Sequence, residues 1–337
     1  MTKYLLYVSH LYSLSIVRPL QTEIIKRGGS VRWYLARKKF VSYLKAGEIS
    51  LDTGKDIEKY NPDVVFVASN SVPHFFPGIK VQLFHGFNAQ KREPETGHFR
   101  IRGFFDLYCT QGPSTTNPFL LLENKYKYFK VIETGWPKMD PLFNTDFKKN
   151  DNHRTQILFT STFTPSLSAA HKIFDTIKRL SEKKNWNFTV TFHPKMDSGI
   201  ANMYKNLKHV NYVETDDVIP LLADADIMLS DTSSILSEFI LQQKPVVTYR
   251  NRVPGKHLIN VTDEKEIESA LEAAQKKPIH LMEEIRKYID HIHPYRDGAS
   301  SGRVLDAADT FLTQYKGKLK KKPLNLFRFI KMKIKHR

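Results

Sequence analysis

The chain has 337 residues and carries 52 Lys and Arg against 35 Asp and Glu, a formal net charge of +17. Hydrophobic residues make up 41% and charged residues 26%, which excludes wholesale disorder, and the length suggests two domains. No apolar run approaches the roughly 20 residues of a membrane-spanning helix, and the first residues do not resemble a secretory signal. The single cysteine, Cys109, excludes an internal disulfide, so we expect a cytoplasmic protein.

The positive charge is concentrated at one end of the chain. Residues 316–337 contain ten Lys or Arg and no acidic residue, which leaves 17 − 10 = +7 for the rest of the chain. A general nucleic-acid-binding protein more often carries its charge as a stripe across the folded domain, and no RNA-binding motif is recognisable. We therefore weigh nucleic-acid binding as an alternative and expect no nucleic-acid partner.

The first part of the chain alternates strand-like and helix-like segments. An amphipathic helix is expected at 13–27, ended by Gly28 and Gly29. Short apolar runs that end in turn-forming residues predict buried strands at 3–9, 31–36, 63–69, 80–86, 106–111 and 130–135. Apolar strands joined by helices are typical of a parallel sheet covered on both faces.

A second series of the same kind follows a polar segment at 140–155, which we interpret as a linker. Strands are expected at 156–162, 188–194, 226–231 and 245–250, and helices at 166–183, 216–223, 232–243 and 303–315. The sequence thus predicts an α/β protein with two Rossmann-like domains, 1–145 and 155–315, whose parallel sheets face a central cleft. Ligands bind in such folds at the carboxyl ends of the strands.

Two histidines follow predicted strands. His85 and Gly86 end one strand of the first domain, and His193 and Pro194 end one of the second. Imidazole has a pKa suited to general-base chemistry, and glycine lets backbone approach a ligand closely. Each histidine has an ordinary alternative, a hydrogen-bonded structural residue at a strand end.

The strongest physical signal is Ser230-Asp231-Thr232-Ser233-Ser234, between a strand and a helix. Hydroxyls and free backbone N–H groups at a helix N-terminus can bind phosphate, although the same residues could simply cap the helix. Asp231 would repel a phosphate, so we expect its carboxylate to bind backbone N–H groups or a ligand hydroxyl. Two further polar segments are Gly135–Asp140 and Asp297–Arg303.

These five segments, in this order, resemble the CDP-glycerol glycerophosphotransferase family, whose members make teichoic-acid-type polymers. His85-Gly86 and His193-Pro194 match its His-Gly and His-Pro, and Ser230–Ser234 matches its Ser/Thr-Asp-Tyr-Ser-Ser. Gly135–Asp140 is similar to its Gly-x-Pro-Arg-x-Asp, and Asp297–Arg303 to its Asp-Gly-x-Ala-Ser-x-Arg. The resemblance covers about residues 85 to 303 and implies the GT-B fold.

The resemblance implies transfer of glycerol phosphate, or a related polyol phosphate, from CDP-glycerol to a hydroxyl of a lipid-linked or polysaccharide acceptor, with release of CMP. His85 and His193 are then the catalytic residues, as base and phosphate ligand. The implied donor-binding residues are Gly86, Pro137, Lys138, Asp140, Ser230, Asp231, Thr232, Ser233, Ser234, Ser301 and Arg303. We expect no metal and no cofactor, since no obvious carboxylate cluster is visible.

Another enzyme of the same fold remains an alternative: a nucleotide-sugar glycosyltransferase or a UDP-sugar 2-epimerase. Such sites commonly add a carboxylate that binds the ribose, and Glu238, six residues after Thr232, could do so.

The basic segment 316–337 predicts docking on the inner face of the cell membrane. After Pro323, Leu324, Phe327, Ile330 and Ile334 recur close to one helical face, surrounded by basic residues. Such a helix can lie among anionic headgroups, which would make the protein cytoplasmic and peripheral to the membrane. The alternatives are a disordered basic end or a helix packed on the first domain.

Overall fold

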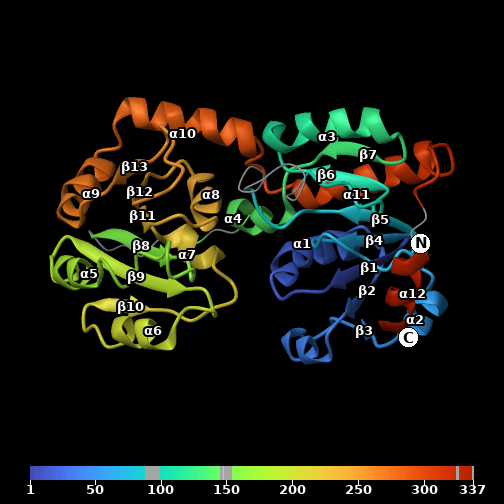
Figure 1. The fold of residues 1–337 in the computed structure, drawn as a ribbon, viewed down its shortest axis with the longest axis horizontal. Helices are drawn as coiled ribbons and strands as arrows, with labels where there is room; N and C mark the ends of the chain where they lie inside the picture. Colours follow the sequence, from blue (N-terminus) through green and yellow to red (C-terminus); the bar gives the residue numbers. More distant parts are fainter. Residues whose placement is uncertain (88–98, 145–146, 148–153, 324–325, 336–337) are drawn as a thin grey trace. The chain divides into compact units, whose positions relative to one another are not determined.

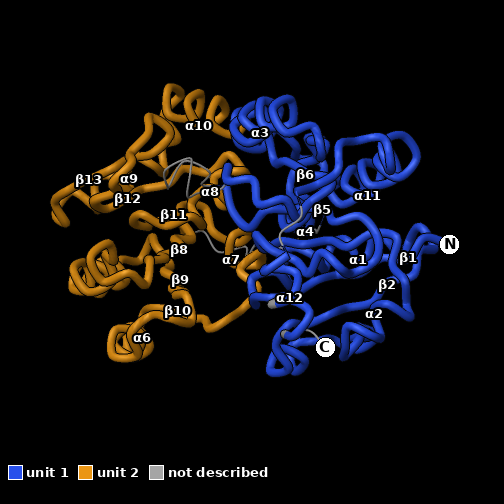
Figure 2. Tube along the Cα trace, turned by 45° about the vertical axis from the view of Figure 1, so that its right-hand side comes forward, with its two compact units in different colours: residues 1–144, 291–337 blue, residues 145–290 orange. Residues whose placement is uncertain are grey.

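The computed structural model describes residues 1–87, 99–144, 147, 154–323 and 326–335. The chain divides into two compact units, which Figure 2 distinguishes by colour: unit 1 is residues 1–144 with 291–337, and unit 2 is residues 145–290. The predicted boundary is corrected at one place, because residues 291–315 return to unit 1 rather than completing the second domain. Most of the predicted linker lies outside the described residues, and its beginning forms helix α4 (Asp140–Asn144).

Unit 1 contains a seven-stranded parallel sheet in the order β3-β2-β1-β4-β5-β6-β7 (Figure 1). Its strands are β1 Lys3–Val8, β2 Ser30–Leu35, β3 Ser50–Leu51, β4 Val64–Val67, β5 Ile79–Gln82, β6 Leu107–Thr110 and β7 Lys130–Glu133. Its other helices are α1 Ser13–Lys26, α2 Gly54–Tyr60, α3 Pro113–Tyr126, α11 Ser300–Thr310 and α12 Leu326–Lys335.

Helices cover this sheet because its strands are apolar on both faces. Leu5 and Tyr7 of β1 share a buried cluster with Ile57 of α2 and Phe119 of α3. Helices α1 and α11 pack against each other, and they contact β1, β2, β4 and β6. The return of the chain after residue 290 therefore completes one layer of unit 1.

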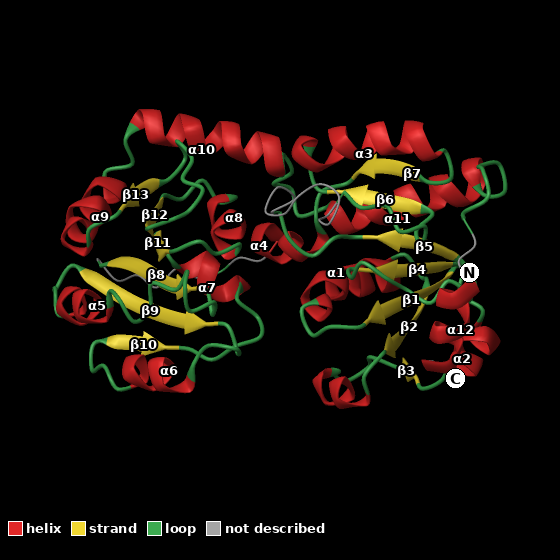
Figure 3. Ribbon diagram, in the orientation of Figure 1, coloured by secondary structure: helices red, strands yellow, loops and turns green. Residues whose placement is uncertain are grey.

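Unit 2 contains a six-stranded parallel sheet in the order β10-β9-β8-β11-β12-β13 (Figure 3). Its strands are β8 Thr155–Ser161, β9 Trp186–Phe192, β10 Val210–Tyr212, β11 Ile227–Ser230, β12 Val246–Tyr249 and β13 Ile259–Val261. Its helices are α5 Phe174–Ser181, α6 Ser198–Lys205, α7 Ile219–Asp224, α8 Ile235–Ile240 and α9 Ile267–Gln275, with α10 Ile279–Ile292 ending at the unit boundary.

The predicted helix at 166–183 is shorter in the structure, where α5 begins only at Phe174. The N–H of Ala169 donates to the Asp231 carboxylate at 3.0 Å, and the N–H of Ala170 donates to the hydroxyls of Ser161 and Ser168. Because these N–H groups bind side chains of the loop, residues 164–173 form turns instead of a regular helix.

The strand order places a topological switch point in each sheet. In unit 1 the connections diverge between β1 and β4, and in unit 2 between β8 and β11. In open α/β sheets generally, the loops from the two strands at such a point leave a crevice in which ligands bind. Two Rossmann-like units with parallel sheets confirm the predicted fold class.

The C-terminal part of the chain ends in two helices. Helix α11 confirms the predicted helix near 303–315 and continues as a short π-helical segment, Phe311–Tyr315. Helix α12 follows Pro323 after a two-residue gap in the described chain. Among the described residues, every helix is too short or too polar to span a bilayer.

Candidate functional site

The segment Ser230–Ser234 lies at the switch point of unit 2, directly after β11. Asp231 is fully buried, and its carboxylate accepts the N–H groups of Thr162 (3.0 and 3.1 Å) and Ala169 (3.0 Å) and the hydroxyl of Ser161. Burial raises the pKa of this carboxyl, while these donors act in the opposite direction. The expectation that Asp231 binds backbone N–H groups is confirmed, so the carboxylate holds the loop after β8 in place.

The hydroxyls around Asp231 have different partners. Ser230 is buried and its hydroxyl pairs with that of Thr160 at 3.0 Å. The Thr232 hydroxyl accepts the N–H of Arg252 at 3.1 Å, which brings the loop after β12 beside the segment. Ser233 is half-buried and Ser234 is exposed, and the Ser234 side chain does not cap α8. Helix α8 has only six residues, so these hydroxyls, rather than a long helix, characterise the site.

His193 follows β9 and contacts the other side of the same loop. Its ring lies 4.7 Å from that of Phe163, and its Nδ1 accepts the N–H of Lys195 at 3.1 Å. A neutral ring with this bond carries its proton on Nε2 and can donate it to an anion. Partial burial, and then the charge of Lys195, lowers the pKa of His193, which favours that neutral form.

His85 follows β5 in unit 1 after an unusual backbone turn. Phe84 has φ of +60°, a left-handed conformation that is rare for an aromatic residue, and its buried ring packs edge-on against Phe119 at 5.1 Å. A Cβ added to Gly86 meets no described atom within 4 Å. The fold therefore places the imidazole of His85 at the carboxyl edge of the sheet, and the described part of the chain leaves space beside Gly86.

Two further residues at this edge, His10 and Tyr12, were not predicted from the sequence. The ring of Tyr12 lies between those of His10 and His85, with centroid distances of 5.1 and 5.3 Å. The Ser9 hydroxyl and His10 Nδ1 are 2.9 Å apart. Because His10 and Tyr12 follow β1 while His85 follows β5, this stack crosses the end of β4 at the switch point. We call His10, Tyr12 and His85 the imidazole stack.

The carboxyl edge of unit 1 has a distinctive composition. The described residues directly after six of its strands include no Asp or Glu: 9–12 (β1), 36–39 (β2), 68–71 (β4), 83–87 (β5), 111–112 (β6) and 134–138 (β7). The titratable groups that these segments present are imidazoles, Tyr12 and basic side chains. The described segments after these six strands thus offer His10 and His85 as candidate bases, while Asp52 follows β3 and Glu133 is the last residue of β7.

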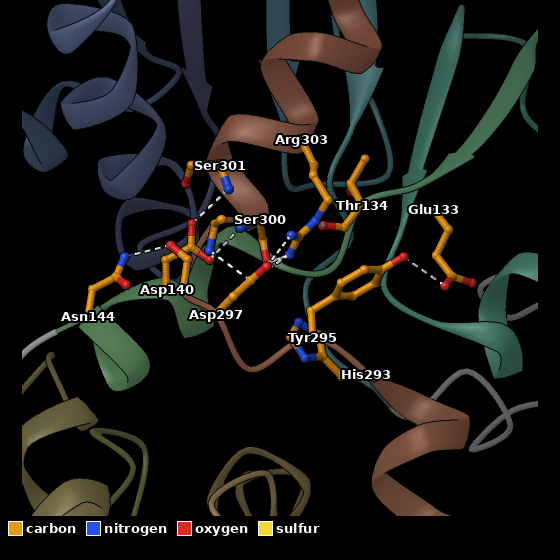
Figure 4. A network of polar contacts seen from close by, with 12 residues as sticks. Glu133, Thr134, Asp140, Asn144, His293, Tyr295, Asp297, Ser300, Ser301 and Arg303 are labelled. Carbon is orange, nitrogen blue, oxygen red and sulfur yellow. Dashed lines mark hydrogen bonds and ion pairs between the residues drawn. The ribbon is translucent and has the colours of Figure 1, made fainter.

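Residues of the two remaining segments contact one another within unit 1 (Figure 4). Asp140 is buried, and its two carboxylate oxygens accept the N–H groups of Ser300 (2.9 Å) and Ser301 (2.7 Å). Burial raises the pKa of this carboxyl, and the bonds to Ser301 and Ser300 oppose the rise. Asp140 therefore binds the first N–H groups of α11, in the way of a helix cap.

Arg303 binds groups of the same two segments. Its guanidinium donates to the carbonyl of Thr134 (2.8 Å), to both carboxylate oxygens of Asp297 (2.7 and 3.1 Å) and to the hydroxyl of Ser300 (3.3 Å). Its charge also lies 4.1 Å from the ring centre of Tyr295. Four donated hydrogen bonds give this side chain a structural role inside unit 1.

Glycine is required where the two segments meet. Gly135 has φ of +78°, and a Cβ there would lie 2.5 Å from the hydroxyl of Ser300. The neighbouring N–H of Trp136 donates to His293 Nε2 at 2.9 Å. We call residues 134–140 and 293–303 the C-terminal clasp, since they hold the returning chain against unit 1. Pro137 and Lys138 belong to it, with the Lys138 ammonium 5.3 Å from the Trp136 ring centre.

The predicted site residues thus fall into three groups. Ser230–Ser234 and His193 flank one loop in unit 2, and His85 and Gly86 lie in the imidazole stack region of unit 1. Pro137, Lys138, Asp140, Ser301 and Arg303 lie in the C-terminal clasp, and donor binding by them stays a prediction. Among the described residues no three His, Cys, Asp or Glu side chains gather as metal ligands would, and metal independence also stays a prediction.

Comparison with known proteins identifies a family and two kinds of relative. The family model described as UDP-N-acetylglucosamine 2-epimerase matches residues 115–309. The teichoic acid ribitol-phosphate polymerase TarL of Staphylococcus aureus is 25% identical over 271 residues, which are 67% of this chain and 46% of that protein. The chain therefore spans a little under half the length of this relative.

Solved structures of both kinds share the fold. A UDP-N-acetylglucosamine 2-epimerase, described as putative, from Listeria monocytogenes superposes with a TM-score of 0.67 at 15% identity, over 96% of this chain and 99% of that chain. The H444N variant of the wall teichoic acid polymerase TagF superposes with a TM-score of 0.64 at 15% identity, over 93% and 89%. At these identities the likeness shows the fold alone.

Proposed function

Because the chain belongs to the UDP-N-acetylglucosamine 2-epimerase family, an enzyme family, we propose that it is an enzyme that uses a nucleotide-activated donor. The donor we propose is CDP-glycerol or a related CDP-polyol, whose polyol phosphate is transferred to a hydroxyl of a lipid-linked or polysaccharide acceptor. This reaction releases CMP and serves the synthesis of a cell-surface polymer. The sequence similarity to TarL, a ribitol-phosphate polymerase, supports the choice of a polyol phosphate.

The observation that carries this proposal is the imidazole stack. Transfer to a hydroxyl needs a base that takes the hydroxyl proton, and the described residues directly after β1 and β5 include His10 and His85 and no carboxylate. His85 is the base in our proposal, and Tyr12 fixes its ring by stacking. Unit 1 then binds the acceptor.

Unit 2 supplies the groups that a diphosphate needs. Thr232, Ser233 and Ser234 provide hydroxyls and N–H groups, and Asp231 is held by donors of the loop after β8. The backbone N–H of Arg252 binds the Thr232 hydroxyl, and His193 can donate from Nε2. Fixed donors of this kind stabilise negative charge as it develops on a leaving phosphate.

In the proposed reaction the acceptor oxygen attacks the phosphorus atom that carries the polyol, while His85 takes the hydroxyl proton. The bond between this phosphorus and the oxygen of CMP breaks, and CMP leaves with the electron pair. Negative charge that develops on CMP is stabilised by His193 and by the hydroxyls after β11. Charge and atoms balance without a metal or a further cofactor.

The test is product analysis with the full chain. CDP-glycerol and CDP-ribitol are each supplied with a lipid-linked disaccharide, with and without EDTA, and products are identified by mass spectrometry. His85→Asn should lower kcat by about 10²- to 10⁴-fold, as for loss of a general base, and EDTA should have no effect. The matched control is His280→Asn, an exposed histidine on α10. Full activity of His85→Asn would exclude the assigned base.

A second candidate is UDP-sugar 2-epimerisation, which the matched family model favours. Glu238 is buried in α8, close in sequence to the Ser/Thr segment, and is the residue we would assign to the ribose in that case. Inversion at a carbon breaks a C–H bond, so an epimerase in heavy water places deuterium in the product. Deuterium in UDP-N-acetylglucosamine, together with thermal stabilisation by UDP but not by CDP, would decide for this candidate.

A further inference from the structure

Helix α12 contacts unit 1 through one of its faces. The ring of Phe329 lies 4.9 Å from His74 and 6.2 Å from Phe75, and Met332 packs against the buried cluster of unit 1. Arg328 donates to the carbonyl of Arg102 at 2.5 Å and lies 4.5 Å from the ring centre of Phe104. Helix α12 therefore packs on unit 1 at a defined position, in agreement with the alternative of a helix packed on the first domain.

The other face of α12 is apolar and exposed. The exposed fractions are 61% for Leu326, 90% for Phe327, 51% for Ile330 and 72% for Ile334. Leu324, which the sequence analysis grouped with them, lies outside the described residues. Four large apolar side chains on ten residues form a patch that soluble proteins usually keep for a partner.

A basic pocket of about 470 Å³ lies where the chain enters α12. Its lining includes Arg100, Arg102, Lys321 and Arg328, together with Tyr126 and Tyr128. Burial, and then the charge of Arg100, lowers the pKa of Arg102. The nearby carboxylate of Asp106 binds Lys322 at 2.7 Å and the N–H of Lys80, and it does not line the pocket.

We propose that the exposed face of α12 and this basic pocket form one docking surface for a membrane of anionic phospholipids. The apolar side chains enter the boundary between headgroups and acyl chains, and the guanidinium groups bind lipid phosphates. Charge complementarity selects this occupant, because residues 316–337 carry ten Lys or Arg and no acid. A second copy of the chain would instead bring two such segments together, and they repel each other.

The first arm of the test removes apolar surface. Full-length protein is sedimented with vesicles of phosphatidylcholine, with or without phosphatidylglycerol, at low and high salt. Phe327→Ser with Ile334→Ser should reduce partition onto the anionic vesicles by at least about 10-fold, because both side chains are buried in the interface. The matched control, Leu121→Ser with Ile279→Ser, changes side chains that are 72% and 78% exposed elsewhere and should bind as the unaltered chain does.

The second arm removes charge. Arg100→Gln with Lys321→Gln should weaken binding to the anionic vesicles about 10- to 30-fold. The matched control is Lys208→Gln with Lys265→Gln, which removes two positive charges from exposed lysines of unit 2 and measures the effect of lower net charge alone. Equal binding by test and control pairs would overturn the proposal, and so would binding that ignores lipid charge and salt. Loss of a dimer in sedimentation velocity by the Phe327 and Ile334 variant, with unchanged vesicle binding, would assign the face to a second copy. The assay needs no nucleotide, so its result is independent of the proposed reaction.

Discussion

His293 is an imidazole whose protonation is controlled by its surroundings. The residue is 1% exposed, its Nε2 accepts the N–H of Trp136, and the rings of Phe87 and Tyr295 lie 5.7 and 5.9 Å away. Burial is the main cause that lowers its pKa to about 4, and the charge of Arg303 acts in the same direction. Folded unit 1 therefore favours the neutral form of the His293 imidazole.

Acid should destabilise unit 1 through this residue. Between pH 4 and the ordinary histidine pKa of about 6.5 the unfolded chain binds more protons, so the stabilising contribution is complete above about 6.5 and is lost as pH falls to 4. The loss amounts to roughly 3 kcal/mol. Hydrogen exchange of unit 1 peptides at pH 7 and 4.5 measures it, with His293→Gln for comparison. If the unaltered chain and the His293→Gln variant were equally sensitive to acid, His293 would not be the residue responsible. The pKa of His257 is also about 4, and this residue is present in both proteins, so its protonation affects them equally.

The histidines show what single residues reveal in a sequence. His85 and His193 were predicted because each follows an apolar run that ends in a turn-forming residue. His10 also follows such a run, after Ser9, and that signal could have found it. Tyr12 gives no signal of its own, because its place between two imidazoles depends on strand order rather than on neighbouring residues.

At the scale of elements, the C-terminal clasp contains contacts that a sequence motif does not reveal. The family resemblance implies donor binding by Asp140 and Arg303, because each belongs to a segment that matches a motif of that family. In the structure Asp140 binds the N–H groups of Ser300 and Ser301, about 160 residues away along the chain. Pairing over such a distance leaves no periodic pattern, so capping and ligand binding look the same in the sequence.

The loop after β8 should depend on the Asp231 carboxylate. Asp231→Asn replaces one acceptor oxygen by an NH₂ group that faces the N–H groups of Thr162 or Ala169, leaving a buried donor without an acceptor. We expect unit 2 to lose about 2–3 kcal/mol of unfolding free energy. Urea unfolding monitored by hydrogen exchange of unit 2 peptides measures the loss. Asp197→Asn, an exposed N-cap of α6, serves as the matched control and should cost about 1 kcal/mol or less.

At the scale of the whole molecule, the two parallel sheets follow from local sequence patterns, but the division of the chain does not. Alternating strands and helices predicted two Rossmann-like domains because each strand is a short apolar run between turn-forming residues. The crossing from unit 2 back to unit 1 lies within the last turn of α10, whose sequence continues without a break in composition. The partners of α11, which include α1 and β6, and the contacts of the C-terminal clasp place residues 291–315 in unit 1.

Truncation after Asp290 should therefore damage the first unit rather than the second. Helix α11 and the segment after it bury Val304, Leu305 and Phe311, each at most 3% exposed, against unit 1. Loss of these three side chains alone removes roughly 5–9 kcal/mol of apolar burial, which is comparable with the whole stability of a domain.

In hydrogen exchange, peptides of residues 1–87 and 99–144 should lose protection in this truncated protein, while peptides of residues 154–275 should keep theirs. The control is truncation after Tyr315, which leaves the C-terminal clasp and α11 in place and should preserve protection of the sheet in both units. Equal loss of protection in the two units after truncation at Asp290 would show that residues 291–315 stabilise unit 2 as strongly as unit 1. That result would contradict the prediction that α11 stabilises mainly unit 1.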